Sequence, residues 1–250
     1  MNKLWTFGCS FTAEYNPIDG LYYPYENQYD KYRTYRGGTL PDVWPELLGK
    51  KINYQTVNCA IGGSSNYTIF NQFIDVCDLI KKDDILIFGW TSMLRFQSVH
   101  LKNNVQVNLL PNANNYEDVG FSKNTLDEIL FNRSNLVWVN EVLGWIKVIN
   151  QIARDRGCEV YHWTSDDTIF KSSDKFIDEK FIVVNDPDYD NLGMLAYLNV
   201  PLNGGNVLTA RIVEETNGEI NDEHMGEFGH IIQSNYFYNH IIKHSKILNK

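Results

Sequence analysis

The sequence predicts an α/β protein in which helices cover both faces of a parallel sheet. Short apolar segments that end at glycine or charged residues alternate with longer segments whose apolar residues recur at helical spacing. Asp84–Gly89 is the clearest strand, because four apolar residues lie between the charged Lys-Lys-Asp-Asp run and a glycine. Asn135–Arg156 is the clearest helix, because its apolar residues recur every three or four positions until Gly157 ends the pattern.

The remaining segments fit the same alternation. Further strands are expected at Leu4–Phe7, Tyr54–Cys59 and Glu159–Trp163. Further helices are expected at Trp44–Lys51, Asn66–Ile80 and Gly226–Leu248. We therefore expect one domain over residues 1–250, with long loop insertions near 13–40 and 100–128.

Two segments interrupt this rhythm and are predicted to be long loops. Tyr15–Arg36 is rich in tyrosine, and His100–Glu128 is rich in asparagine with weak periodicity. Loops of this length are usually functional or disordered. We expect both to lie over one end of the sheet.

Composition and charge exclude several classes of protein. The 250 residues are 43% hydrophobic and 21% charged, which is ordinary for a globular domain and excludes a disordered or coiled-coil chain. A net charge of −9 argues against a nucleic-acid partner. The four cysteines contain no CxxC pair, which argues against a disulfide scaffold or a zinc ribbon. Because no apolar segment is long enough for a signal peptide or a membrane span, we expect a cytoplasmic protein without a membrane partner.

A candidate site residue or turn follows each of the first three predicted strands. Ser10 comes directly after the first strand, where α/β sheets place their ligands, although serine is also a common helix N-cap. The Gly62-Gly63 turn after the second strand lets main-chain N–H groups approach a ligand, or is simply a turn. Thr91 and Ser92 follow the third strand and offer hydroxyl groups or N-caps.

Near the C-terminus, Asp222 and His224 stand just before the last predicted helix. A carboxylate close to a histidine can fix its tautomer and stabilise the imidazolium, as a general base requires. The alternative is an acidic loop in solvent that carries a surface histidine.

The order of these motifs is more informative than any one of them. The blocks are FGCSFT (Phe7–Thr12), NCAIGG (Asn58–Gly63), FGWTS (Phe88–Ser92) and DEHMGEFGH (Asp222–His230). Over nearly the whole chain, this order resembles that of the SGNH/GDSL hydrolase superfamily. The resemblance implies a three-layer α/β/α sandwich around a flavodoxin-like parallel sheet of about five strands.

The resemblance also implies a set of roles. Ser10 corresponds to the nucleophile, His224 to its base and Asp222 to the residue that orients the base. The main-chain N–H groups of Ser10 and Gly63 correspond to donors of the oxyanion hole. No metal and no organic cofactor are implied.

Two departures concern the nucleophile and the oxyanion hole. The usual Gly-Asp-Ser triplet is Gly-Cys-Ser here, and Cys9 is expected to point away from Ser10 because side chains alternate along extended backbone. Thr91 stands where the superfamily supplies an asparagine to the oxyanion hole. Either Thr91 replaces that donor, Asn66 moves in, or the enzyme is slow.

A third departure concerns the spacing before the histidine. The superfamily usually has its aspartate three residues before the histidine, and Asn221 occupies that position here. Asp222, two residues before, is the preferred partner of His224, and Asn221 is the alternative. His230 lies further into the last helix and is interpreted as structural.

The expected function is hydrolysis of an ester by a serine esterase. Tyrosine-rich loops and six tryptophans suit stacking on sugar rings, so a short acyl group, such as acetyl, on a carbohydrate is favoured. Two alternatives remain open. One is a weakened family member that serves as a binding or structural module, for example a carbohydrate-binding or virion component; the other is an acyltransferase on the same triad.

Overall fold

The computed structural model describes residues 1–15, 28–92, 95–99, 106–109, 120, 122–132, 135–164, 211–222 and 224–249. All predicted site residues lie within these ranges. None of the helices in this part of the chain combines the length and apolarity needed to cross a membrane.

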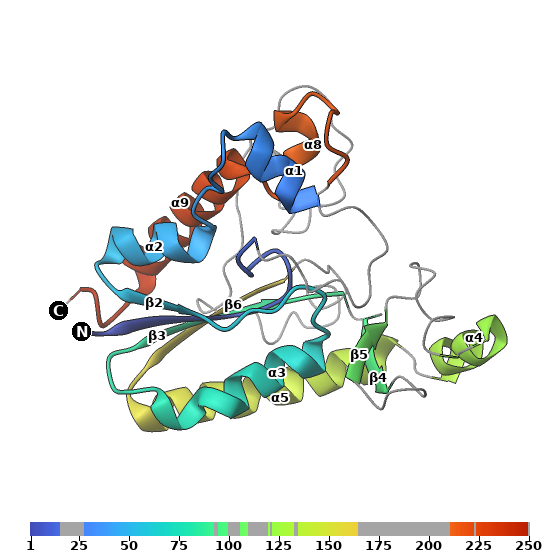
Figure 1. Cartoon of the computed structure of the whole chain (residues 1–250). Helices are drawn as coiled ribbons and strands as arrows, with labels where there is room; N and C mark the ends of the chain where they lie inside the picture. Colours follow the sequence, from blue (N-terminus) through green and yellow to red (C-terminus); the bar gives the residue numbers. More distant parts are fainter. Residues whose placement is uncertain are drawn as a thin grey trace.

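The described residues form one parallel sheet of four strands in the order β2-β1-β3-β6 (Figure 1). Their bounds are Lys3–Phe7 for β1, Gln55–Asn58 for β2, Ile85–Trp90 for β3 and Glu159–Thr164 for β6. All three strand pairings are parallel. The sheet has four strands rather than the expected five or so, and its order matches the first four strands of a flavodoxin-like sheet.

Helices cover both faces of this sheet and make a three-layer α/β/α sandwich (Figure 1). One layer contains α2 (Trp44–Ile52) and α9 (Glu227–His244), which contact each other. The other contains α3 (Asn66–Val76), continued by the short η1 (Cys77–Leu79), and α5 (Asn135–Arg156). The predicted strands and helices are confirmed, with shifts of a few residues at their ends.

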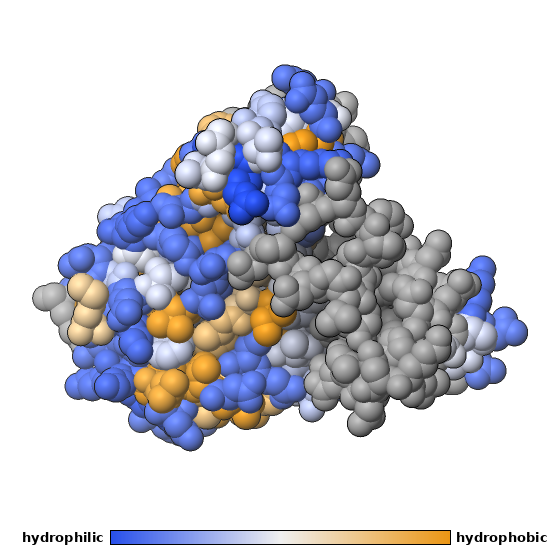
Figure 2. Space-filling model, viewed as in Figure 1, coloured by the Kyte–Doolittle hydropathy of each residue, from blue (hydrophilic) through white to orange (hydrophobic). Residues whose placement is uncertain are grey.

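Alternation along the strands divides the core into two clusters. On the α3 and α5 side, the strand residues are Trp5, Phe7, Leu86, Phe88, Trp90 and Val160. On the α2 and α9 side, they are Leu4, Ile85, Ile87, Tyr161 and Trp163. Apolar side chains also reach the surface over α3 and α5, among hydrophilic residues (Figure 2).

Both predicted loops contain regular structure, so these two predictions were wrong in part. The Tyr15–Arg36 segment includes α1 (Gln28–Tyr35). The His100–Glu128 segment includes β5 (Gln106–Leu109), which pairs antiparallel with β4 (Phe96–Val99), and the start of α4 (Lys123–Asn132). Short, polar elements of this kind owe their stability to contacts with distant residues, which local periodicity does not reveal.

Candidate active site

Ser10 lies in a tight turn directly after β1. The N–H groups of Thr12 and Ala13 both donate to the carbonyl oxygen of Cys9 at 2.9 Å, which closes the turn. No helix begins within residues 11–15, so Ser10 caps no described helix. Cys9 is buried, at 3% exposure, while Ser10 is partly exposed.

Gly8 is required at the start of this turn because the backbone is crowded there. A Cβ atom at Gly8 would lie 2.4 Å from Thr12 Oγ1 and 2.8 Å from Thr12 Cβ. The fully buried Thr12 side chain therefore occupies the space that a larger residue at position 8 would need.

Asp222 and His224 form the imidazole–carboxylate pair that the sequence predicts. Asp222 Oδ1 accepts a hydrogen bond from the main-chain N–H of His224 at 2.8 Å, and it lies 2.6 Å from His224 Nδ1. Asp222 is buried and Asn221 is exposed, so the aspartate is the residue that pairs with the imidazole. Burial favours a raised pKa for Asp222, but the hydrogen bonds and charge of His224 outweigh it and lower the pKa below its ordinary value.

Aromatic contacts place His224 beside the β1 turn. Its ring centroid lies 5.4 Å from that of Phe11, the residue after Ser10, and 5.8 Å from that of Tyr29 on α1. Ser10 Oγ forms no hydrogen bond with any residue in the described ranges, so the serine–histidine contact is not made in this structure. Catalytic hydrogen bonds often tighten only when substrate binds.

His230 has a structural role, in agreement with its interpretation from sequence. It is 2% exposed, and its Nδ1 accepts a hydrogen bond from the main-chain N–H of Trp44 at 3.1 Å. Burial, with a smaller contribution from the charge of His224, lowers the pKa of His230 to about 3. The imidazole is therefore neutral at physiological pH and ties α9 to α2.

The glycine turn after β2 lies against the residues that follow β1. Gly63 has a φ of 79°, in the left-handed region that glycine adopts without strain. The N–H of Ile61 donates to Gly8 O at 3.2 Å, which joins the two turns. Neither the N–H of Ser10 nor that of Gly63 donates to another residue in the described part of the chain, so both can donate to a ligand.

The strand order and these turns decide the fold assignment. A parallel sheet of order β2-β1-β3-β6 carries a serine turn after β1, a glycine turn after β2 and an Asp–His pair before the last helix. The predicted α/β/α fold with a flavodoxin-like parallel sheet is thus confirmed, and the turns and the Asp–His pair lie where the resemblance to the SGNH/GDSL superfamily implies.

Comparison with known proteins found similarity to two solved structures. A protein from Desulfitobacterium hafniense DCB-2, described as lipolytic and of the G-D-S-L family, is 13% identical, with a TM-score of 0.43 and coverage of 96% of this chain and 99% of that chain. Protein YxiM from Bacillus subtilis is 14% identical, with a TM-score of 0.35; the match covers 95% of this chain but only 46% of YxiM. No family model matches the sequence, and no curated protein matches it.

Gln72, on α3, is a site residue that sequence analysis missed. Its side-chain oxygen accepts from the N–H of Gly8 at 3.1 Å, and its Nε2 donates to Gly8 O at 3.2 Å and to Ser64 Oγ at 2.9 Å. One buried amide therefore fixes both the end of β1 and the glycine turn. The available signal was a glutamine on the apolar face of α3, adjacent to Phe73.

Asn66 makes a similar paired contact with the end of β3. Its Oδ1 accepts from the N–H of Thr91 at 2.8 Å, and its Nδ2 donates to Thr91 O at 3.0 Å. Asn66 was predicted as an alternative oxyanion donor, and its amide contacts the main chain of Thr91, the residue that the sequence resemblance places in the oxyanion hole. Thr91 is buried, at 3% exposure.

Asn58 is the first residue of the second sequence block and the last residue of β2. Its side chain links this end of β2 to β1 and to the turn after β1. Its Nδ2 donates to Thr12 O at 2.8 Å, and its Oδ1 accepts from Thr6 Oγ1 at 2.9 Å. Asn58, Asn66 and Gln72 thus fix the main chain around Ser10, Gly63 and Thr91 with three side-chain amides.

Proposed function

We propose that this chain is a serine esterase that removes a short acyl group, such as acetyl, from a carbohydrate, with Ser10 as nucleophile and His224 as base. The observation that carries the proposal is the Asp222–His224 hydrogen bond of 2.6 Å, on an imidazole that packs against Phe11 next to Ser10. An oriented histidine beside a serine at a strand end is the arrangement that nucleophilic acyl transfer needs.

In the proposed reaction, His224 removes the proton of Ser10 as Oγ attacks the ester carbonyl carbon. The C=O electron pair moves to oxygen, and the resulting oxyanion accepts hydrogen bonds from the N–H groups of Ser10 and Gly63, with Thr91 as a third candidate donor. Collapse breaks the bond to the sugar oxygen, which takes the proton from the imidazolium. Water then attacks the acyl-serine, His224 takes its proton, and the carboxylic acid leaves with Ser10 restored.

The carbohydrate part of the proposal rests on aromatic residues beside His224. Phe11 and Tyr29 are partly exposed and contact the imidazole, so their rings can also meet the apolar faces of a sugar. Tyr15 and Tyr32, which come from the same tyrosine-rich segment, are buried and belong to the core instead.

The direct test is hydrolysis of p-nitrophenyl acetate by the wild type and by Ser10→Ala. The proposal expects loss of turnover in the variant, and unchanged turnover would remove Ser10 from the mechanism. Cys9→Ser is the matched control, since a neighbouring thiol that is buried should contribute nothing to the chemistry. Adding sugar acceptors to the same assay tests acyl transfer, which would divert the acyl group from water.

Two observations favour a second candidate function. Thr91 stands in place of the amide donor, and Ser10 Oγ makes no hydrogen bond within the described residues. Both features fit a weakened family member that binds glycans without cleaving them. Folded protein that binds glycans but neither cleaves short esters nor reacts with a fluorophosphonate would support this candidate.

A further inference from the structure

The loop that carries Asp222 and His224 is held by residues from both sides. The N–H of Val213 donates to Asp222 O at 3.1 Å, and that of Ile212 donates to His224 O at 3.0 Å. Ile212 and Val213 begin α8 (Ile212–Glu215), which packs beside α1 and the start of α9 (Figure 1).

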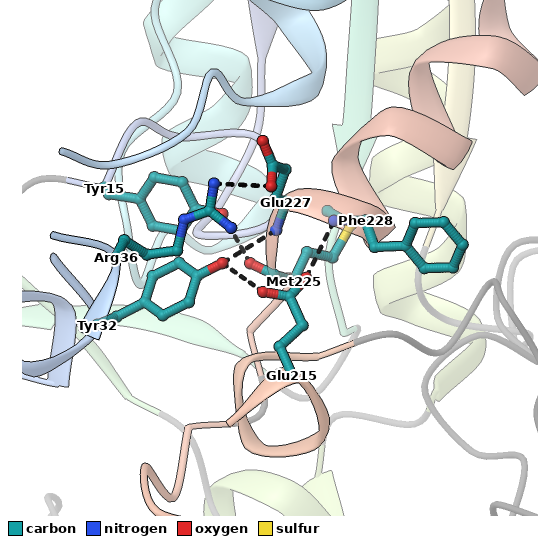
Figure 3. A network of polar contacts seen from close by, with 7 residues as sticks. All are labelled: Tyr15, Tyr32, Arg36, Glu215, Met225, Glu227 and Phe228. Atoms are coloured by element: carbon teal, nitrogen blue, oxygen red, sulfur yellow. Dashed lines mark hydrogen bonds and ion pairs between the residues drawn. The ribbon is translucent and has the colours of Figure 1, made fainter. Parts of the chain in front are cut away.

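Residues from the tyrosine-rich segment complete this hold. The hydroxyl of Tyr15 donates to the main-chain oxygen of Met225, the residue after His224, at 2.8 Å. On α1, the hydroxyl of Tyr32 donates to Glu215 Oε2 and accepts from the N–H of Glu227 at 3.1 Å. These groups converge in one network around the start of α9 (Figure 3).

Glu215 connects the network to α9. Its Oε1 accepts from the N–H of Phe228 at 3.0 Å, so a carboxylate satisfies a free donor at the N-terminus of α9 (Figure 3). Gly226 permits this approach, because a Cβ there would lie 2.2 Å from the Glu215 carboxylate. Arg36, just after α1, forms an ion pair of 2.7 Å with Glu227.

The residues that hold the loop are packed in the interior of the protein. Tyr32 and Ile212 are fully buried, and Tyr15 is 9% exposed, in a cluster with Val43 and Ile220. The helix that bears Tyr32 is closed by glycines: Gly37 and Gly38 both have positive φ, and the N–H of Gly38 donates to Arg33 O at 2.9 Å.

We propose that Tyr15, Tyr32 and Glu215 form a clasp that positions the loop bearing Asp222 and His224 against the Ser10 turn. Tyr15 and α1 thereby act as positioning elements, joining residues near the N-terminus to the base loop near the C-terminus. The inference rests on the proposed function, because orienting His224 matters for catalysis only if His224 is the base. The hold on the loop itself stands on the hydrogen bonds alone.

The test compares Tyr15→Phe and Tyr32→Phe with Tyr54→Phe. Tyr54 donates to Asp83 O at 3.2 Å and accepts from Asn2 Nδ2 at 3.3 Å, at the end of the sheet where the strands begin, so its variant loses hydroxyl hydrogen bonds without touching the loop. Hydrogen exchange at the amides of Ile212 and Val213 is measured first, because it reports the loop without any need for activity. Faster exchange in Tyr15→Phe and Tyr32→Phe, with no change in Tyr54→Phe, supports the clasp.

Turnover of p-nitrophenyl acetate is the second readout. Misplacing a reacting group by about 1 Å can cost up to about 10²-fold, so kcat should fall by as much as that while KM stays unchanged. Glu215→Gln, which keeps the size of the side chain, is expected to show both effects and serves if a tyrosine variant does not fold. Unchanged exchange in the clasp variants overturns the inference, as does faster exchange with wild-type kcat.

The proposed function is tested separately, by measuring the activity of His224→Ala. If that variant keeps wild-type activity, His224 is not the base, and the exchange measurement alone then decides whether the clasp holds the loop.

Discussion

Asp222 Oδ1 accepts two hydrogen bonds from His224, one from its main-chain N–H at 2.8 Å and one from ring Nδ1 at 2.6 Å. The two-residue spacing makes this possible, because an aspartate oxygen reaches the N–H two residues on in an Asx-turn. The same oxygen also accepts from ring Nδ1, which leaves Nε2 as the nitrogen that can take a proton. The two-residue spacing is therefore sufficient to orient the imidazole.

Asp222→Asn tests this arrangement. An asparagine can hold the main-chain N–H but can present an amide donor to Nδ1, which favours the wrong tautomer. We expect kcat for p-nitrophenyl acetate to fall by about 10⁴-fold, as in a serine protease whose orienting aspartate is changed in this way. The control is Asn221→Ala, because the exposed Asn221 is expected to be silent. A larger loss in the control than in Asp222→Asn would reverse the assignment.

His230 should make the protein less stable in acid. Its folded-state pKa of about 3 lies below the unfolded value of about 6.5, so the unfolded chain takes up a proton that the folded chain refuses. The free energy of unfolding should fall by about 2 kcal/mol from this group as the pH drops from about 7 to 5. His230→Asn, whose Oδ1 can still accept from Trp44, should lose this contribution in urea titrations at the two pH values. Equal pH dependence in variant and wild type would contradict the prediction.

Glu46 should change the free energy of unfolding in the opposite direction between about pH 5 and 7. Burial, reinforced by the charges of Glu14 and Asp42, raises its pKa to about 7, so the folded chain holds the extra proton. The contribution of Glu46 to the free energy of unfolding is fully present below the unfolded pKa of about 4.5. It is lost as the pH rises through the folded-state pKa of about 7. Glu46→Gln should therefore gain stability relative to the wild type, by up to about 2 kcal/mol, between about pH 5 and 7. A wild type that is nearly flat in this range, with the two variants sloping in opposite directions, is the expected pattern.

The elements that sequence analysis predicted well carry their signal locally. β3 is an uninterrupted apolar strand that is buried along its whole length, and α5 repeats apolar residues on one face. The Asp222–His224 pair also depends on neighbours in sequence. In each case, the residue pattern that predicts the element lies within the element itself, although β3 also pairs with the distant strands β1 and β6.

The elements that were missed depend on partners far along the chain. Tyr32 gives α1 its buried side chain, but it looks like a polar loop residue until Glu215 and Glu227 are known to lie beside it. Gln72 and Asn66 bind main-chain atoms of Gly8 and Thr91. Because nearly every residue type has the same main-chain groups, the sequence does not show which residues such side chains contact. The supporting amides of a site are therefore harder to predict than its reactive groups.

Gln72→Leu should weaken both activity and stability. It leaves the N–H of Gly8 without its side-chain partner, which typically costs about 1–3 kcal/mol for a buried group, whereas Gly8 O keeps its hydrogen bond from the N–H of Ile61. Because Gly8 stands two residues before Ser10, kcat should fall as well. The matched control is Gln151→Leu, since exposed Gln151 bonds only to Asp155 within α5 among the described residues. Loss of stability with wild-type kcat would show that Gln72 supports the fold without setting the site.

Thr91→Asn tests whether the site lacks an oxyanion donor. Removal of one such donor commonly costs about 10²–10³-fold in turnover, so an asparagine that reaches the oxyanion should raise kcat by up to that factor. Thr91 is buried, and Asn66 holds its main chain through two hydrogen bonds, so the backbone should stay in place when the side chain is enlarged. Thr91→Val is the matched control, because it keeps the shape and removes the hydroxyl. If Thr91→Val lowers kcat and Thr91→Asn leaves it unchanged, the threonine hydroxyl already serves as the donor. If Thr91→Asn raises kcat and Thr91→Val has no effect, the hydroxyl contributes nothing and the oxyanion hole lacks one donor.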